Sequence, residues 1–120
     1  MKINFKKLNH IQICIPKGEE EKGREFYCGI LGLTEIEKPE NLKKNGGFWL
    51  QAGDIQLHIG TEQITGKSKR HPAFEIEKLE IVKHYLKEKG IKIKEEDEIP
   101  GIKRFSLFDY WDNRIELIEK

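Results

Sequence analysis

Apolar and polar residues alternate along several short stretches of this chain, beginning with residues 8–15. Ile11, Ile13 and Ile15 fall on one face of that stretch, and polar residues occupy the other. A period of two predicts a half-buried β-strand. Residues 19–30 follow with acidic residues first and then an apolar stripe at helical spacing, so a helix is predicted there.

Three short strands are predicted after this helix, the last two as a hairpin: residues 33–36, 48–51 and 55–60. Residues 62–69 are polar and form a connector. The order then repeats, as a strand, a helix and three strands: residues 71–76, 79–89, 91–94, 104–108 and 114–119. The chain is therefore predicted to be an α+β fold of paired βαβββ modules, about 1–62 and about 70–120, within a single domain of residues 1–120.

Helices outside such a fold would leave the polar faces of a cupped mixed β-sheet to line a cavity. In each half a histidine lies near the start of the first strand and a second potential ligand lies in the last strand. The two pairs are His10 with His58 and His71 with Glu116, which are 48 and 45 residues apart. A single polar residue on a strand is usually just solvated, so the repetition is what favours a site.

Imidazole and carboxylate ligands together suit a divalent ion such as Zn, Ni, Mn or Fe. The remaining histidine, His84, lies among charged residues of the second predicted helix, so it is assigned to a solvated face. Four polar or aromatic residues near the predicted ligands are candidates for a substrate cavity: Gln12, Trp49, Trp111 and Arg114. Phe105 is instead expected in the core.

The overall charge is +1, because 22 Lys and Arg nearly balance 21 Asp and Glu. This balance gives no support to nucleic-acid or anionic-membrane binding. No apolar run approaches the roughly 20 residues of a membrane span, and the first residues lack the apolar core of a signal peptide. A cytoplasmic location is therefore expected, with Cys14 and Cys28 as reduced thiols.

Four stretches of the chain are similar to family patterns: Leu8-Asn-His-Ile-Gln-Ile, Phe26-Tyr-Cys-Gly-Ile-Leu-Gly-Leu, His71-Pro-Ala-Phe-Glu-Ile and Phe108-Asp-Tyr-Trp-Asp-Asn-Arg-Ile-Glu-Leu. Together they resemble the vicinal oxygen chelate superfamily, the glyoxalase, bleomycin resistance and extradiol dioxygenase family. The resemblance implies paired βαβββ modules with a metal held by His10, His58, His71 and Glu116. One departure is Asp112, which stands where many relatives have glycine in the last turn, and we expect it to be left-handed.

Two functions follow from the resemblance. The first is a metal-dependent enzyme, of lyase, isomerase or thiol transferase type, in which a divalent ion acts as a Lewis acid on a small oxygenated substrate. Glu116 and His58 are then the candidate catalytic residues. The alternative is a non-catalytic drug-binding protein of the bleomycin-resistance type. The resemblance also implies a homodimer.

Overall fold

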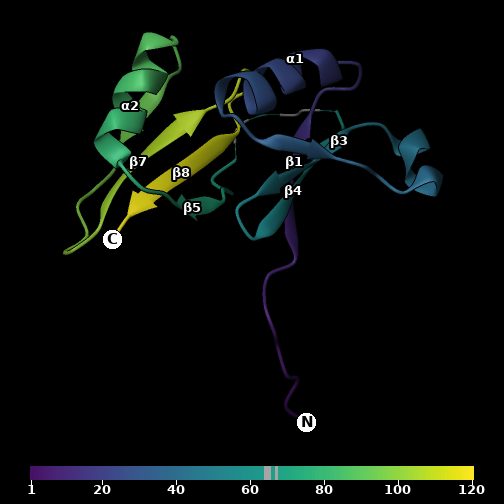
Figure 1. Cartoon of the computed structure of the whole chain (residues 1–120), viewed down its shortest axis with the longest axis horizontal. Coiled ribbons are helices and arrows are strands. Elements are labelled where there is room, and N and C mark those ends of the chain that lie inside the picture. Colours follow the sequence, from purple (N-terminus) through teal and green to yellow (C-terminus); the bar gives the residue numbers. More distant parts are fainter. Residues whose placement is uncertain (64–65, 67) are drawn as a thin grey trace. The chain divides into compact units, whose positions relative to one another are not determined.

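The computed structural model describes residues 1–63, 66 and 68–120. The chain forms two compact units, Met1–Ile64 and Thr65–Lys120, shown in purple to teal and in green to yellow in Figure 1. Their boundary falls within the predicted connector, of which residues 64, 65 and 67 lie outside the described residues.

The first unit contains β1 (His10–Ile15), α1 (Glu20–Arg24), η1 (Glu25–Ile30), β2 (Thr34–Ile36), η2 (Glu40–Asn45), β3 (Phe48–Ala52) and β4 (Ile55–Thr61). Its four strands form one sheet in the order β1-β4-β3-β2, in which β1 and β4 are parallel and the other pairs are antiparallel. The helix predicted over residues 19–30 is present, and its second half, η1, is a π-helix. The 3₁₀-helix η2 lies between β2 and β3, in a segment for which neither a helix nor a strand is predicted from the sequence.

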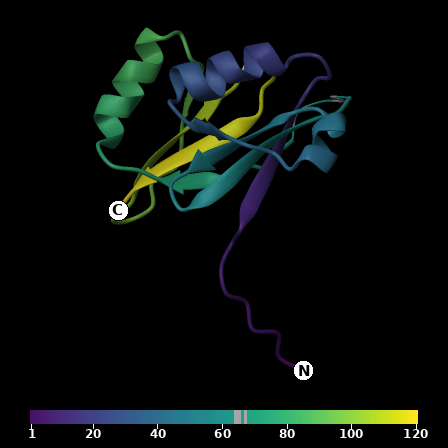
Figure 2. The same cartoon turned by 45° about the vertical axis from the view of Figure 1, so that its right-hand side comes forward.

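The helix of the first unit covers one face of its sheet, as Figures 1 and 2 show from two directions. Alternation along β1 places Ile13 and Ile15 on the covered side, where both are buried. Phe26 and Tyr27 of η1 are fully buried and supply the helix side of this core. The apolar pattern read from the sequence therefore describes the packing of this layer.

The second unit contains β5 (Ala73–Glu75), α2 (Leu79–Glu88), β6 (Ile93–Glu95), β7 (Lys103–Phe108) and β8 (Arg114–Glu119). Its sheet has the order β5-β8-β7-β6, which repeats the order and the strand directions of the first sheet. The α+β fold of paired βαβββ modules is confirmed. Phe105 is fully buried, as expected, and so are Leu79 and Leu86 of α2.

Two predicted strands of the second unit begin later than expected. His71 precedes β5, because the next residue is Pro72, which has no N–H to give to a ladder. Ile91 precedes β6, because its N–H donates to the carbonyl of Leu86 and closes the end of α2. Both shifts arise from backbone hydrogen bonding, which hydrophobic alternation does not report.

The final turn has the geometry expected of it. Asp112 has a φ of 66°, so an aspartate does occupy the left-handed position. Asp109 Oδ1 accepts hydrogen bonds from the backbone N–H of Trp111 and of Asn113, each at 2.9 Å, and holds the turn. Across the residues that the structure describes, no helix is both long and apolar enough to span a bilayer.

Candidate functional site

Three aromatic rings stack in the first unit, on the strands β1, β3 and β4. The imidazole of His58 lies parallel to the indole of Trp49, with 3.9 Å between ring centroids and 2° between planes. The imidazole of His10 covers the same ring of His58, with centroids 4.1 Å apart. The structure therefore brings the first predicted pair together. The ring nitrogens of His10 and His58 lie in nearly parallel planes in this arrangement, so the two rings would have to turn on their side-chain bonds to bind one ion together.

Hydrogen bonds indicate where each of these imidazoles carries its proton. His58 Nε2 lies 2.9 Å from Gln56 Oε1, and His10 Nδ1 lies 2.9 Å from Asn9 Oδ1. An amide oxygen only accepts, so each of these ring nitrogens donates. Burial lowers the pKa of His58 below its ordinary value, and the charges of His10 and Lys38 lower it further. A neutral His58 is competent as a ligand or as a proton acceptor.

The second predicted pair meets within the second unit, where His71, just before β5, faces Glu116 of β8. His71 Nε2 lies 3.2 Å from Glu116 Oε1, and Glu116 is only 7% exposed although it is charged. His71 Nδ1 lies 2.8 Å from the backbone oxygen of Lys69, which accepts and therefore requires a proton on Nδ1. Both nitrogens of one imidazole thus face oxygen acceptors. A proton or a bound cation between Nε2 and Oε1 would satisfy this contact.

Two arginines hold the carboxylate of Glu116 from the neighbouring strand and from its own. Arg104 Nη1 donates to Glu116 Oε2 at 3.2 Å, and Arg114 Nη2 lies 3.9 Å from Oε1. Both guanidinium groups are largely buried. Because the Oε2 contact fixes the rotation of the carboxylate, Oε1 is held facing His71.

Sequence reasoning missed Arg104, and it also missed Ser106 and Glu96. Ser106 is fully buried, and its hydroxyl donates to Glu96 Oε1 at 2.8 Å and accepts from Arg114 Nε at 3.0 Å. Arg114 Nη2 also donates to Glu96 Oε1 at 2.9 Å. Burial alone would raise the pKa of Glu96, but Ser106 and Arg114 together lower it below its ordinary value. The signal was available, since Ser106 pairs with Glu116 once the β7–β8 hairpin is in register.

The candidate cavity residues have different surroundings. Trp49 is half-buried under the His58 ring, and Trp111 is half-buried on the final turn, beside Tyr110. Gln12 is exposed, and Arg114 is taken up by the contacts with Glu96 and Ser106. Gln12 and Trp49 belong to the first unit, and Trp111 and Arg114 belong to the second. A substrate cavity lined by residues of both units therefore stays a prediction.

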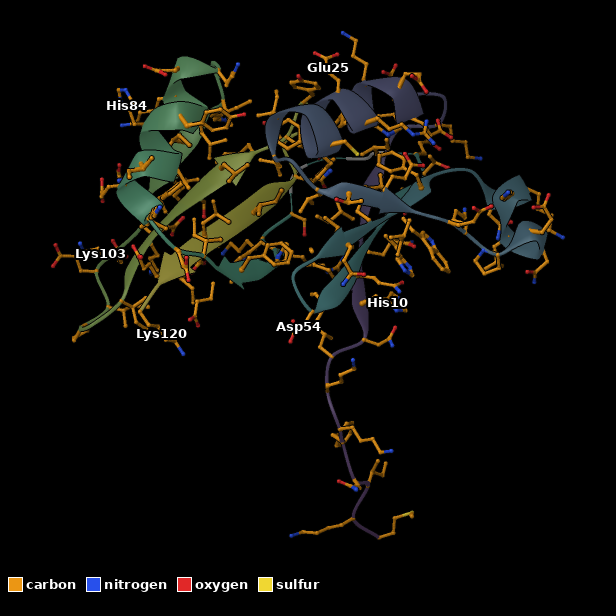
Figure 3. All side chains as sticks on the ribbon, in the orientation of Figure 1. His10, Glu25, Asp54, His84, Lys103 and Lys120 are labelled. Carbon is orange, nitrogen blue, oxygen red and sulfur yellow. The ribbon has the colours of Figure 1, made fainter. Side chains whose placement is uncertain are left out.

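His84 has the solvated position that its sequence context indicates. Figure 3 shows it on α2, pointing away from the strands, and its side chain is 77% exposed. Its Nε2 lies 3.0 Å from Glu88 Oε1, one helical turn further on. The exposed pair of His84 with Glu88 is thus a control, in the same chain, for the partly buried pair of His71 with Glu116.

The ligand chemistry of the second pair fits a divalent ion. A nitrogen and an oxygen 3.2 Å apart are close enough to share one ion at metal–ligand distances of about 2.0–2.2 Å. Among the described residues no group of three or more His, Cys, Asp or Glu gathers in one place. The pair His71 and Glu116 is therefore the part of the predicted ligand set whose contacts match metal binding.

Comparison with known proteins now places this geometry in a family. The family model described as Glyoxalase/Bleomycin resistance protein/Dioxygenase superfamily matches residues 7–117. A glyoxalase family protein from Bacillus anthracis is 40% identical and superposes with a TM-score of 0.92, covering 100% of this chain and 99% of its own. A glyoxalase family protein from Enterococcus faecalis is 27% identical, with a TM-score of 0.77 and coverage of 96% and 98%.

The genomically encoded fosfomycin resistance protein FosX from Listeria monocytogenes shares the fold at 18% identity, with a TM-score of 0.79 and coverage of 98% and 95%. No curated protein sequence matches the chain. The family model covers nearly the whole chain, and the repeated βαβββ units agree with it. This chain belongs to the Glyoxalase/Bleomycin resistance protein/Dioxygenase superfamily.

Proposed function

We propose that the protein is a metal-dependent enzyme that uses a divalent ion, of Zn, Ni, Mn or Fe, on a small oxygenated substrate. His71 and Glu116 are the central ligands, His10 is a third, and His58 is a fourth ligand or a proton acceptor. The contact of His71 with Glu116 carries the proposal, because an imidazole that donates from Nδ1 to the oxygen of Lys69 is left with Nε2 facing Glu116 Oε1, a nitrogen and an oxygen that can bind one ion. When bound, the ion would act as a Lewis acid toward substrate oxygens.

The residues around this pair have roles that follow from their contacts. Arg104 holds Glu116 Oε2, which leaves Oε1 directed at His71. A carboxylate held in this way keeps its position during a reaction, which is what a catalytic or ligating group needs. Trp49 holds the His58 ring flat and shields one face of it from water. The reaction class proposed is of lyase, isomerase or thiol transferase type, with Glu116 and His58 as the groups that move protons.

Metal content of the protein without a histidine tag is the first test. We expect about one ion per chain by elemental mass spectrometry after incubation with each metal and dialysis. His71→Ala and Glu116→Gln should lose that ion, and His10→Ala should weaken its binding. His84→Ala is the matched control, because it removes an equally carboxylate-paired histidine from a solvated helix. Circular dichroism of each variant separates metal loss from unfolding.

Two outcomes would contradict the proposal. One is wild-type protein that stays empty after incubation with all four metals. The other is a variant set in which His84→Ala loses as much metal as His71→Ala. A wild type without metal would make small-molecule sequestration the leading function, with Trp49 and Trp111 as the stacking residues to test.

A further inference from the structure

The N-terminal nine residues form an arm that leads out of β1, as Figures 1 and 3 show. Apolar residues alternate along it with polar ones, since Met1, Ile3 and Phe5 are separated by Lys2 and Asn4. This is the pattern of a strand with one apolar face. The arm nevertheless belongs to no helix or strand of the first unit.

The apolar side chains of this arm are open to solvent. Ile3 is 66% exposed, Phe5 is 86% exposed and Leu8 is 58% exposed. Within the described parts of the chain, residues 1–8 make no hydrogen bond or ion pair, and the first backbone contact is from Gln56 N–H to the oxygen of Asn9. Adjacent large apolar side chains exposed in this way mark an interaction segment.

The second unit has a groove with an apolar and acidic lining and a volume of about 690 Å³. It lies between the first turns of α2 and the connection from β6 to β7, which ends where β7 begins at Lys103, labelled in Figure 3. Its apolar lining includes Leu79, Ile99 and Ile102, and Ile99 is 41% exposed. The neighbouring strand β6 is the last strand of its sheet, so one side of its backbone is unpaired within that sheet.

The groove is negatively charged. Its lining contains five acidic residues, Glu80, Glu95, Glu96, Asp97 and Glu98, against three basic ones, Lys83, Lys103 and Arg104. Two of these lining residues pair with partners that do not line the groove, Glu96 with Arg114 and Arg104 with Glu116. Without them the lining still has four acidic residues against two basic ones.

The arm has the opposite charge, because residues 1–9 contain three lysines and no acidic residue. An extended arm of nine residues also spans up to about 30 Å, which is enough to reach beyond its own unit. Both the apolar face and the charge of the arm therefore match the groove.

We propose that the arm of one copy of this chain docks as an extended strand in the groove between α2 and the β6–β7 connection of a second copy. Ile3 and Phe5 pack on the apolar lining, and the lysines of the arm face Asp97 and Glu98. An extended segment that adds to the open side of an edge strand is a common mode of peptide recognition. Two copies that exchange arms form two equivalent contacts, as a symmetric dimer requires.

Photo-crosslinking of the full chain tests this contact. Phe5 is replaced by benzoylphenylalanine, and the labelled chain is prepared in light and ¹⁵N-labelled forms that are mixed before irradiation. We expect crosslinked peptides that join the arm to residues 79–104, with light arms joined to heavy grooves. The same probe at Asp54, in the exposed β3–β4 turn, is the control and should give no such product.

Charge reversal supplies a second measurement that misfolding cannot imitate. Asp97→Lys with Glu98→Lys, or Lys6→Glu with Lys7→Glu, should each lower the crosslinking yield roughly fivefold. A mixture of the two double variants should restore the yield between reversed arms and reversed grooves. Salt at about 1 M should lower the wild-type yield, because charges on the surface are then screened within a few ångströms.

Three outcomes would overturn the proposal. Products that join only light to light and heavy to heavy place the arm on its own chain. Crosslinked products that lie outside residues 79–104, or the absence of any crosslinked product, would contradict docking of the arm in the groove. Sedimentation of the wild type with phosphatidylserine vesicles, lost in Lys6→Glu with Lys7→Glu, together with no groove crosslink, makes the arm a membrane-binding segment.

Discussion

His58 is enclosed between Trp49 and His10, with the indole 3.9 Å away on one side and the imidazole 4.1 Å away on the other. This enclosure removes water from the ring, which is why its pKa lies below the ordinary value of 6.5. Trp49→Leu opens one face of the ring and should raise that pKa toward 6.5. A ¹H–¹³C NMR titration of the imidazole measures both values, and an unchanged midpoint in Trp49→Leu would contradict the role of the stack.

The same enclosure makes stability depend on pH. Below about pH 6.5 the unfolded chain takes up a proton on His58 before the folded protein does. The free energy of unfolding should therefore fall as the pH drops from 6.5 to the lowered folded-state pKa of His58. Urea unfolding of His58→Gln over this window should show a flatter dependence. Equal slopes for both proteins would show that burial of His58 does not make stability depend on pH in this window.

Gly47 precedes β3 with a φ of 79°, and a side chain there would collide with the backbone oxygen of Ile59. Gly53 has a φ of 62° in the β3–β4 turn, with open space around it. We expect Gly53→Ala to cost about 1 kcal/mol, from the left-handed backbone alone. Gly47→Ala should cost about 2–4 kcal/mol, because β3 must also shift away from β4. Urea denaturation measures both, and equal losses would mean that the backbone contact does not matter.

Most of the fold was predictable because two periodicities determine it. Alternation located the strands, and the apolar stripes located both helices, including the buried Phe26. The repeat then gave the topology, since both sheets have the same strand order. The exact starts of β5 and β6 were not predictable from alternation, because Pro72 and the helix-capping N–H of Ile91 determine them.

The candidate site was predictable only in part. The two pairs, His10 with His58 and His71 with Glu116, do meet as the repeat indicates. Arg104 was not predicted as a site residue, because a basic residue on a strand is ordinarily solvated. Its contact with Glu116 depends on the register between β7 and β8. The stacking of the His58 ring likewise depends on side-chain rotation, which a residue pattern does not encode.

Ser106 connects Glu96 and Arg114 through one hydroxyl in the core of the second unit. Ser106→Ala leaves a buried guanidinium N–H and a buried carboxylate oxygen each short of one partner. We expect a loss of about 1–3 kcal/mol in the free energy of unfolding. Ser68→Ala is the control, because Ser68 also accepts a hydrogen bond, from the N–H of Arg70, but is exposed. A comparable loss in both variants would argue against the buried network.

Glu119, at the end of β8, caps the start of α2 from a distant part of the chain. Its Oε1 accepts from the N–H of Leu79 at 3.1 Å, and its Oε2 accepts from that of Lys78 at 2.9 Å. The hydrogen bond from Leu79 has the largest effect on the pKa of Glu119, and together with that from Lys78 it lowers this pKa below its ordinary value. The charge of Lys103 lowers it further. The carboxylate form is thus the one that the fold favours.

The contribution of this cap should depend on pH in a defined direction. A carboxyl group whose pKa is lowered on folding stabilises the protein above its unfolded-state pKa, and loses that effect as the pH falls through the folded-state value. Glu119→Gln keeps an acceptor without the charge, so it should be less stable than the wild type at pH 7, and the difference should shrink below the ordinary value of 4.5. Glu119→Ala lacks any acceptor, so it should remain the least stable at both ends of the range. Thermal unfolding between pH 3 and 7 measures all three proteins, and a difference between wild type and Glu119→Gln that grows toward low pH would rule out the charged cap.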